Sequence, residues 1–544
     1  MRFTIFLTIL ISILGTDLMG SSPDMSEFSF KKDMPINCNR AHSYIKWDGH
    51  LDDVYFYDVQ HYDIALDVTD TTDFTLSGTV KITAKTTKED FSEIIFDLHD
   101  KLMITSIKYS GGTYNNYNIS LDSEVERVGM RVFVTIPEII EMDQDFSIEI
   151  DYNGPMISQY TSNGWYINGL LVDHYLGKVN LYTLSEPEES RFWWPNKNIP
   201  GDKATVNMDL TVWDYQFGSG NGKLIDTVTN GDKKTYKWEE SYPVANYLVA
   251  IAVYPYQIIE DSYTSLDGTI TMPVEYYMFP DEYQLYKPNV DKTPSIIKAF
   301  AERFGEYPYI EEKYAMVSMA QGGGMEHQTV STMGGYYEKV IVHELAHMWF
   351  GDQITCKTWN DTWMNEGGAS YLEGLWKEEK YGFEALNDHM QDIKNQAMSN
   401  NSHLNDQEYA LTGLIYKKGA WVYHMLRHVL GDEDFFANLT YLLNESEYAY
   451  GNATGKEYIT YLGELSGKDL NYFWDQWINH GGYPKYTYGS NKIDSGSGSI
   501  VDVQIGQEQD ITTKEVPFFK MPIDIKIKFE DGTDSTIVVE NEAV

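Results

Sequence analysis

The chain has 544 residues, several times the usual length of one domain, and its 42% hydrophobic and 23% charged residues are typical of a globular protein. Asp and Glu number 82 against 41 Lys and Arg, so the formal net charge is −41. A surface this negative repels phosphate, which makes nucleic acids and anionic membranes poor partners. We therefore expect several folded domains and no nucleic-acid partner.

The first twenty residues are typical of an export signal. Arg2 precedes an apolar run at 3–14, which is too short to cross a bilayer and is followed by small and polar residues. We expect a signal peptide at 1–20, a polar linker at 21–40, and a secreted or periplasmic protein without stable membrane insertion. An uncleaved signal anchor or a disordered leader is the alternative. The two cysteines, Cys38 and Cys356, are too few for a disulfide framework, so both are expected to be free thiols, with a bridge between them as the alternative.

Residues 41–255 are predicted to form an N-terminal β domain. Hydrophobic and polar residues alternate in this region as they do in half-buried strands. The clearest alternating runs lie at 62–68, 78–84, 130–136 and 146–151.

Residues 256–484 change to the spacing of amphipathic helices, which are expected at 294–304, 339–350, 362–380, 385–398, 416–430 and 470–479. The tail, 485–544, returns to alternation at 501–505, 523–529 and 536–540. Three strands are few for an independent sheet. The tail therefore either packs on the helical domain or is the first part of a truncated β domain. The predicted fold class is multidomain α+β, with a short C-terminal β segment.

The segment His343-Glu344-Leu345-Ala346-His347 has the spacing of a metal site. Residues four apart share one face of a helix, so both imidazoles can reach one ion, and the Glu344 carboxylate flanks that face. Neutral imidazole suits Zn²⁺, and a catalytic zinc takes three protein ligands and a water. Glu366 is the candidate third ligand, because the eighteen intervening residues allow a turn and a second helix. The sequence thus predicts one zinc ion per chain, against the alternative of a surface helix that carries two histidines by chance.

The same block resembles the aminopeptidase N and leukotriene hydrolase family of zinc metallopeptidases. That family combines H-E-x-x-H and a downstream Glu with an upstream G-x-M-E-N, which here is Gly323-Gly324-Met325-Glu326-His327. Tyr416-Lys417-Lys418-Gly419-Ala420 is similar to the family's Y-x-K-G-A, and the stretch from Glu186 through Arg191 to Pro195 is similar to its Q-x-x-x-x-R-x-x-x-P. The resemblance runs from about residue 58 to 484 and implies a thermolysin-like, mainly helical catalytic domain capped by the β domain.

The resemblance also implies catalytic roles. His343, His347 and Glu366 would hold the zinc ion, which activates a water and polarises the scissile carbonyl. Glu344 would be the general base, and Tyr416 would donate a hydrogen bond to the developing oxyanion. Without the family pattern, Tyr416 would be interpreted as a packing residue, because the chain has 42 tyrosines.

An exopeptidase needs a group that recognises the free α-amine of its substrate. The resemblance assigns this role to Glu326, with Glu366 contributing from the metal side. Gly323 and Gly324 would let the substrate backbone approach closely. Met325 is a candidate lining residue for the first side chain of the peptide. The expected partners are therefore peptides with a free N-terminal amine, and the oligomeric state is left open.

Two positions depart from the family pattern. Glu186 stands where the family often has a glutamine that helps to hold the amine. It either adds a third carboxylate to that site or lies on an exposed loop. His327 stands at the final Asn of G-x-M-E-N and is bulkier than the amide.

The resulting hypothesis is a secreted zinc aminopeptidase that removes single residues from peptide N-termini. Three alternatives are a family hydrolase with an additional epoxide or lipid substrate, a thermolysin-type endopeptidase, and an inactive homologue that binds peptides. Glu326 argues against the endopeptidase because it would block the non-primed side. The complete set of zinc ligands, general base and Tyr416 argues against a pure binding protein.

Overall fold

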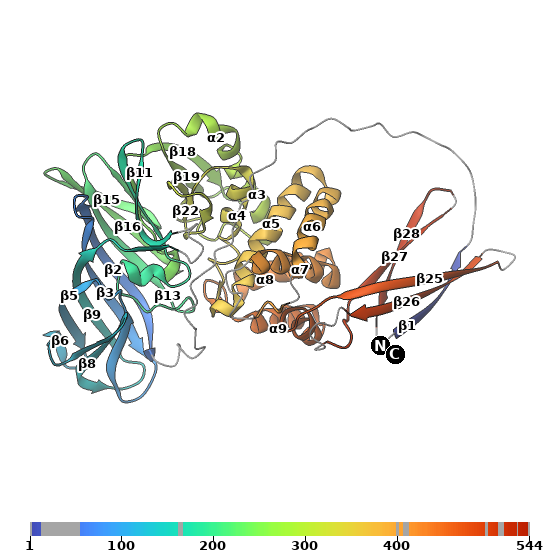
Figure 1. The fold of residues 1–544 in the computed structure, drawn as a ribbon, viewed down its shortest axis with the longest axis horizontal. Helices are drawn as coiled ribbons and strands as arrows, with labels where there is room; N and C mark the ends of the chain where they lie inside the picture. Colours follow the sequence, from blue (N-terminus) through green and yellow to red (C-terminus); the bar gives the residue numbers. More distant parts are fainter. Residues whose placement is uncertain are drawn as a thin grey trace.

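The computed structural model describes residues 3–11, 55–160, 167–398, 402–405, 413–494, 499–509, 516–529 and 531–541. An N-terminal β domain is followed along the long axis by a mainly helical domain, from which a group of β-strands projects (Figure 1). This order of β-rich, helical and β parts confirms the predicted fold class.

The largest sheet of the β domain has eight strands, in the order β15-β16-β13-β2-β3-β9-β5-β6. Its strands bury alternate residues, as their hydrophobic alternation requires; in β3 these include Val80, Ile82 and Ala84. The central pair β2 and β13 run parallel, whereas β2 and β3 are antiparallel. The strands are β2 (Tyr57–Asp70), β3 (Thr75–Thr86), β5 (Met103–Gly111), β6 (Tyr114–Asn118), β9 (Asp145–Pro155), β13 (Lys203–Trp213), β15 (Lys223–Asn230) and β16 (Lys233–Ala245).

Two smaller sheets complete the β domain, in the orders β4-β8-β7 and β10-β11-β12-β17-β14. Asn180 of β12 accepts a hydrogen bond at Oδ1 from the Ala320 N–H (3.2 Å), so the five-stranded sheet adjoins the helical domain. The strands are β4 (Phe91–Asp97), β7 (Val125–Val128), β8 (Arg131–Ile140), β10 (Ser158–Tyr160), β11 (Ile167–Tyr175), β12 (Lys178–Leu184), β14 (Phe217–Ser219) and β17 (Ala252–Tyr254).

The helical domain contains a sheet that the sequence analysis did not predict, in the order β18-β19-β20-β22-β21. Strands β20 and β22 are buried at every residue, so they lack the alternation by which the other strands were recognised. The strands are β18 (Gln257–Thr264), β19 (Thr271–Met278), β20 (Tyr314–Ser318), β21 (Gly324–Met325) and β22 (Val330–Met333).

Helices pack beside this sheet, and every predicted helix has a counterpart. Helix α4 ends at Ala346, earlier than predicted, because the chain then turns and the Asp352 N–H bonds to the His347 carbonyl (2.9 Å). Helices α2, α8 and α9 were not predicted. The helices are α2 (Tyr283–Val290), α3 (Thr293–Phe304), α4 (Glu338–Ala346), α5 (Trp363–Tyr381), α6 (Phe383–Ala397), α7 (Gly413–Leu430), α8 (Asp432–Glu445), α9 (Gly455–Ser466) and α10 (Asn471–Phe473), which continues as a π-helical turn at Trp474–Ile478.

The tail packs on the helical domain through the ring of Phe519, whose centroid lies 4.8 Å from that of Trp477. Its strands are β25 (Pro484–Asp494), β26 (Ser499–Gln509), β27 (Pro522–Lys528) and β28 (Asp534–Glu540), one more than predicted. Strand β1 (Phe3–Ile11), which falls within the predicted signal peptide, pairs antiparallel with β26. The remainder of that signal and the linker with Cys38 lie outside the described residues, whereas Cys356 is a buried free thiol.

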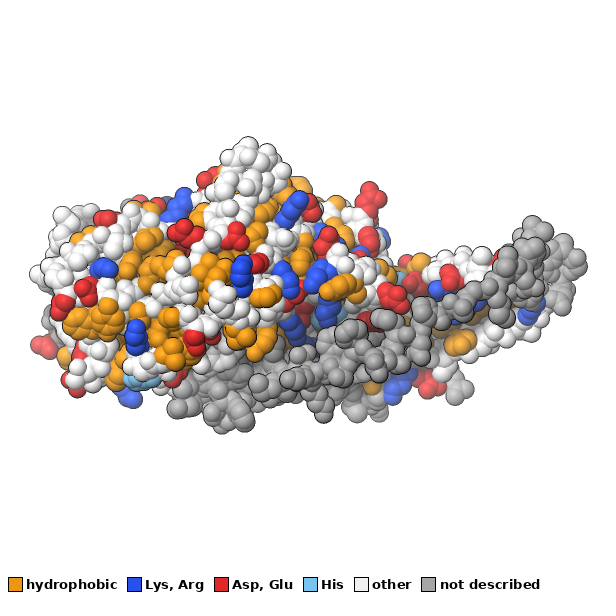
Figure 2. All heavy atoms as spheres, turned by 90° about the horizontal axis from the view of Figure 1, so that it is seen from above, with side chains coloured by type: hydrophobic (Ala, Val, Ile, Leu, Met, Phe, Trp, Pro, Cys, Tyr) orange, Lys and Arg blue, Asp and Glu red, His pale blue; other side chains and the backbone are white. Residues whose placement is uncertain are grey.

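One face of the molecule carries side chains of every kind (Figure 2). Figure 2 shows acidic and basic side chains interspersed with hydrophobic ones over one face of the β and helical domains. Over the described part of the chain, none of the helices is both long and apolar enough to cross a bilayer.

Candidate active site

Three donor atoms converge between α4 and α5, and we call this group the metal centre. His343 lies in the last turn of α4, His347 directly follows that helix, and Glu366 lies in the first turn of α5. The Nε2 atoms of the two histidines are 3.3 Å apart, and Glu366 Oε2 lies 3.2 Å from the first and 3.4 Å from the second. These atoms are close enough to ligate one ion.

The other nitrogen of each imidazole is held by the protein. Nδ1 of His343 lies 3.1 Å from Glu373 Oε1, and Nδ1 of His347 lies 3.0 Å from the Phe350 carbonyl oxygen. Such contacts fix the ring orientation and leave Nε2 for a metal. Glu373 was not singled out from the sequence, although it lies two helical turns after Glu366, on the same face of α5.

The electrostatics of the metal centre favour a cation. Burial alone would lower the pKa of His343, but hydrogen bonds with Glu366 and Glu373 raise it well above its usual range. Burial would likewise lower the pKa of His347, yet Glu326 and Glu366 raise it to about 9. Two imidazoles and one carboxylate in a negative environment are a donor set that fits Zn²⁺.

Glu344 is buried beside the metal centre. Burial raises the pKa of its carboxyl to about 7, although His343 and His347 act in the opposite direction. A carboxyl group with this pKa can both accept and release a proton near neutral pH. Gly324 faces it, and a Cβ at that position would lie 2.1 Å from Glu344 Oε1, so any side chain there would displace the Glu344 carboxylate.

Tyr416 reaches the metal centre from α7. Its hydroxyl donates a hydrogen bond to Glu366 Oε1 (2.6 Å). The helices approach closely here because both contribute a glycine: a Cβ on Gly419 would lie 2.8 Å from the Cα of Gly367. Each glycine lies close to a functional residue of its own helix: Gly367 directly follows Glu366, and Gly419 lies one turn after Tyr416.

Three carboxylates meet next to the metal centre, and we call them the amine pocket. Oxygen atoms of Glu186, Glu326 and Glu366 lie within 4.8 Å of one another, and all three side chains are buried. The structure therefore places Glu186 with the other two rather than on an exposed loop. Gly323 adjoins open space, whereas Met325 is fully buried in the core, which does not support its prediction as a lining residue.

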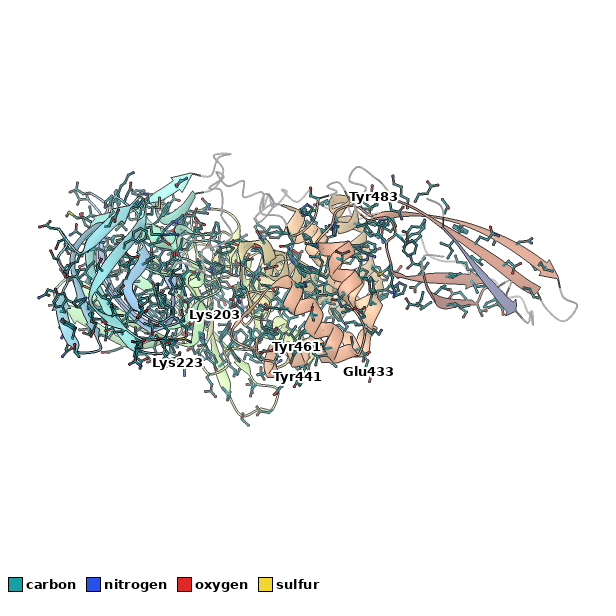
Figure 3. All side chains as sticks on the ribbon, turned by 90° about the horizontal axis from the view of Figure 1, so that it is seen from below. Lys203, Lys223, Glu433, Tyr441, Tyr461 and Tyr483 are labelled. Carbon is teal, nitrogen blue, oxygen red and sulfur yellow. The ribbon has the colours of Figure 1, made fainter. Side chains whose placement is uncertain are left out.

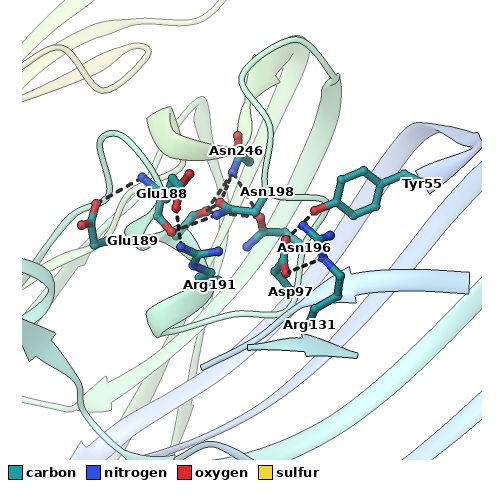
Figure 4. Close-up of polar contacts among 10 residues, drawn as sticks. Tyr55, Asp97, Arg131, Glu188, Glu189, Arg191, Asn196, Asn198 and Asn246 are labelled. Carbon is teal, nitrogen blue, oxygen red and sulfur yellow. Dashed lines mark hydrogen bonds and ion pairs between the residues drawn. The ribbon is translucent and has the colours of Figure 1, made fainter. Parts of the chain in front are cut away.

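A polar network of the β domain holds the segment that follows Glu186 (Figure 4). Ser190 donates a hydrogen bond from Oγ to Asn198 Oδ1 (2.6 Å), and Asn246 Nδ2 donates to Ser190 Oγ (2.8 Å). Asn168 Nδ2 donates directly to the Glu186 carbonyl oxygen (2.8 Å). Glu186 thus enters the amine pocket from a fixed backbone.

The β domain also contacts the segment that follows His347. Lys203, at the start of β13, lies between the β domain and the helices (Figure 3) and donates from Nζ to the Asp352 carbonyl oxygen (2.6 Å). Burial lowers the pKa of this lysine to about 7. The candidate site is therefore bounded by both domains.

Comparisons with known proteins agree with this architecture. Residues 58–248 match the model of the peptidase M1 N-terminal domain, and residues 289–477 match that of the peptidase family M1 domain. Probable aminopeptidase 2 of Sulfurisphaera tokodaii is 26% identical over 73% of this chain and 54% of its own length. Aminopeptidase M1 of Arabidopsis thaliana is 28% identical over 57% of this chain and 38% of its own. The chain thus spans about half the length, or less, of these relatives.

A solved structure shares the fold over most of its length. The M1 zinc metallopeptidase from Deinococcus radiodurans has a TM-score of 0.69 at 24% identity, with 78% of this chain and 94% of that chain covered. The two family models together match well over half of the residues, in the order and at the places where the β domain and the metal centre lie. On this evidence the chain belongs to the peptidase M1 family.

Proposed function

We propose that this protein is a zinc-dependent aminopeptidase that hydrolyses the first peptide bond of peptides with a free N-terminus. The observation that carries the proposal is the junction of the metal centre and the amine pocket at Glu366. One oxygen of this carboxylate faces the two histidines, and the side chain also borders Glu186 and Glu326. A cationic N-terminus held by these carboxylates would place the first peptide bond next to the metal centre.

The residues of the chain supply most steps of the reaction. When bound by His343, His347 and Glu366, a zinc ion would polarise the scissile carbonyl and acidify a water. Glu344 takes the proton of the attacking water and delivers it to the leaving amine. Tyr416, whose hydroxyl is bonded to Glu366 Oε1 in the structure, would donate its hydrogen to the carbonyl oxygen as negative charge develops there.

Names and titles of similar proteins support the same reaction. The two relatives described above are named aminopeptidases. The D. radiodurans metallopeptidase has also been solved as a mutant bound to a Tyr-Ser-Ala substrate. A family hydrolase with an additional epoxide or lipid substrate and an inactive peptide-binding homologue are the competing functions.

The decisive experiment is a panel of aminoacyl fluorogenic substrates and their N-acetylated equivalents, assayed with and without a zinc chelator. We expect cleavage of the free-amine substrates only, loss of turnover with chelator and recovery on addition of zinc. The Glu344→Gln variant is the matched control, since it keeps the ligands and lacks the base. Equal cleavage of blocked substrates, or turnover that resists the chelator, would overturn the proposal.

We also propose that the protein is exported, as residues 1–20 suggest. Cleavage after this leader would remove β1 from the mature chain. Intact-mass measurement of the protein from its native host should give a species shorter by roughly the leader. A full-length N-terminus would contradict export by cleavage.

A further inference from the structure

The turn that carries Glu326 is held from the β domain. Residues 326–329, which we call the anchor turn, connect β21 to β22. The turn closes through a hydrogen bond from the Val330 N–H to the His327 carbonyl oxygen (3.0 Å) and another between His327 Nδ1 and Thr332 Oγ1 (2.8 Å). Its first residue lies in the amine pocket, so the conformation of the turn sets where that carboxylate lies.

The last residue of the anchor turn has a strained backbone. Thr329 is fully buried and has a φ of 64°, in the left-handed region that β-branched residues avoid. Among the residues that the structure describes, the other non-glycine residues with positive φ are not β-branched. A conformation of this kind persists only where the surroundings impose it, and such strain often occurs at functional sites.

The contacts that impose it come from the β domain. The Gly222 N–H donates to Thr329 Oγ1 (2.7 Å). The hydroxyl hydrogen of Thr329 can go to the Gln328 carbonyl oxygen within the turn (2.6 Å) or to Glu240 Oε2 in the β domain (3.1 Å). Asn221 Nδ2 donates to the Gln328 carbonyl oxygen (2.6 Å), and Gln328 Nε2 donates to Glu240 Oε1 (3.1 Å). Two segments of the β domain, the β14–β15 loop and β16, therefore hold the two residues at the end of the turn.

These holding groups are themselves fixed. Asn221 Oδ1 accepts a hydrogen bond from the Ala250 N–H (2.8 Å), which orients its amide. Glu240 is buried beside Glu312, and burial together with this second carboxyl group raises the pKa of Glu240 well above its usual range. Lys313 donates from Nζ to the Gly220 carbonyl oxygen (2.9 Å) and so fixes the start of the β14–β15 loop. The anchor turn is thus held by a rigid, buried network rather than by mobile surface groups.

We propose that Thr329 is a positioning residue through which the β domain sets the Glu326 carboxylate in the amine pocket. The inference rests on the proposed aminopeptidase function and adds to it a second route, besides Glu186, by which the β domain governs recognition of the peptide N-terminus. Thr329 acts through the anchor turn and is not a catalytic residue. The metal centre lies on α4 and α5, so loosening the turn should impair amine recognition and leave zinc binding intact.

A pair of hydroxamate inhibitors separates these two effects. Leucine hydroxamate carries the α-amine, whereas 4-methylpentanoic hydroxamate has the same side chain and zinc-binding group without it. The inhibition constant of the amine-free compound divided by that of leucine hydroxamate measures the contribution of the amine alone. We expect Thr329→Val to lower this ratio by about tenfold, as for a misplaced charged contact, while inhibition by the amine-free compound and the zinc content stay at wild-type values. Thr329→Ser, which keeps the hydroxyl, should retain the ratio.

Two further variants complete the test. Tyr175→Phe is the matched control, because it removes another interdomain hydrogen bond, from Tyr175 Oη to Asp281 Oδ1 (3.0 Å), without touching the anchor turn. Glu240→Ala removes both contacts of this side chain with the turn and decides the question if Thr329→Val does not fold. A wild-type ratio in folded, zinc-loaded Thr329→Val or Glu240→Ala would overturn the proposal, as would an equal loss in Tyr175→Phe. A wild-type enzyme that binds both hydroxamates equally would refute the aminopeptidase function instead.

Discussion

The metal centre and the amine pocket share Glu366 but are built in different ways. The metal centre takes its ligands from one helix, the residue directly after it and the first turn of α5, all within the helical domain. The amine pocket combines residues 186, 326 and 366, which come from two domains and three separate segments. Its positions are set by buried networks, such as the contacts of Asn168 with Glu186 and of Glu240 with the anchor turn.

This difference separates the groups proposed to hydrolyse the peptide bond, in the metal centre, from those proposed to recognise the substrate, in the amine pocket. In the proposed reaction, hydrolysis would depend on groups whose spacing is set by helix geometry, so the metal centre can form wherever α4 and α5 pack together. Recognition of the peptide N-terminus would depend on how the β domain sits against the helical domain. Changes in the metal centre should therefore abolish turnover, and changes in the amine pocket should alter which substrates are bound and how they are placed.

The largest effect is expected from Glu344→Gln. Only the base is removed, so kcat should fall by about 10²–10⁴-fold while zinc is retained. His343→Ala should instead lose the metal, as metal analysis of the purified variants would show. Stoichiometric zinc in a variant that lacks both His343 and His347 would contradict the ligand assignment.

Glu326→Ala tests the amine pocket. Loss of this carboxylate should cost about 2–4 kcal/mol of transition-state stabilisation, since one partner of a buried charge pair is truncated. KM should rise and kcat should fall together, because the ammonium anchor also positions the scissile bond. The measurement is steady-state kinetics on free-amine substrates, with zinc content as the control. Undiminished activity would remove the main support for exopeptidase action.

Gly419→Ala tests the helix contact that brings Tyr416 to the metal centre. The added methyl group would press on Gly367, and overpacking of this kind costs about 1–3 kcal/mol. We expect α7 to shift and kcat to fall by about tenfold with zinc retained, which is less than the loss in Tyr416→Phe. If the thermal midpoint falls but kcat is unchanged, the two glycines serve stability alone.

Glu338→Gln tests how the metal-bearing helix is anchored within its own domain. Burial would raise the pKa of Glu338, but Lys292, Lys380 and Trp376 hydrogen-bond to it and lower the pKa to about 2. This stabilisation is present above the ordinary pKa of about 4.5 and is lost as pH falls toward 2. After allowance for partial exposure we expect the variant to lose about 1–2 kcal/mol of unfolding free energy. Denaturant unfolding should show this difference near pH 6 and a smaller one near pH 3. A difference independent of pH would argue against the ion pairs.

The smallest effect is expected from Glu186→Gln. Glutamine keeps a hydrogen-bonding oxygen, and a neutral acceptor is roughly half as strong as a charged one. KM for free-amine substrates should rise only a few-fold, with kcat and zinc content unchanged. Steady-state kinetics of Glu186→Gln, measured on the same substrates as Glu326→Ala, allow the two variants to be compared directly. A loss as large as in Glu326→Ala would make Glu186 the main anchor of the amine and shift the centre of the pocket toward the β domain.

The elements that could be predicted from the sequence follow the same division. Strands with one exposed face, such as β3, and the helices around the metal centre were predicted because their periodicity is visible in the sequence. Strands β20 and β22 were not, because complete burial removes the alternation. Met325 was expected to line a pocket, yet it lies in the core. The prediction was wrong because nothing in the local sequence shows which way this residue faces.

By itself, the sequence determined the order of β and helical parts and the shared helix face of His343 and Glu344 with His347, because spacings of two, three and four residues act over distances that the local backbone sets. The tertiary structure alone decided that Glu186 joins Glu326, that Gly367 meets Gly419, and that Thr329 is held in a strained turn. Each of these depends on contacts between segments tens to more than a hundred residues apart. Such contacts form only when the buried faces of separate elements pack together, and the local periodicity of the sequence does not indicate which faces will meet.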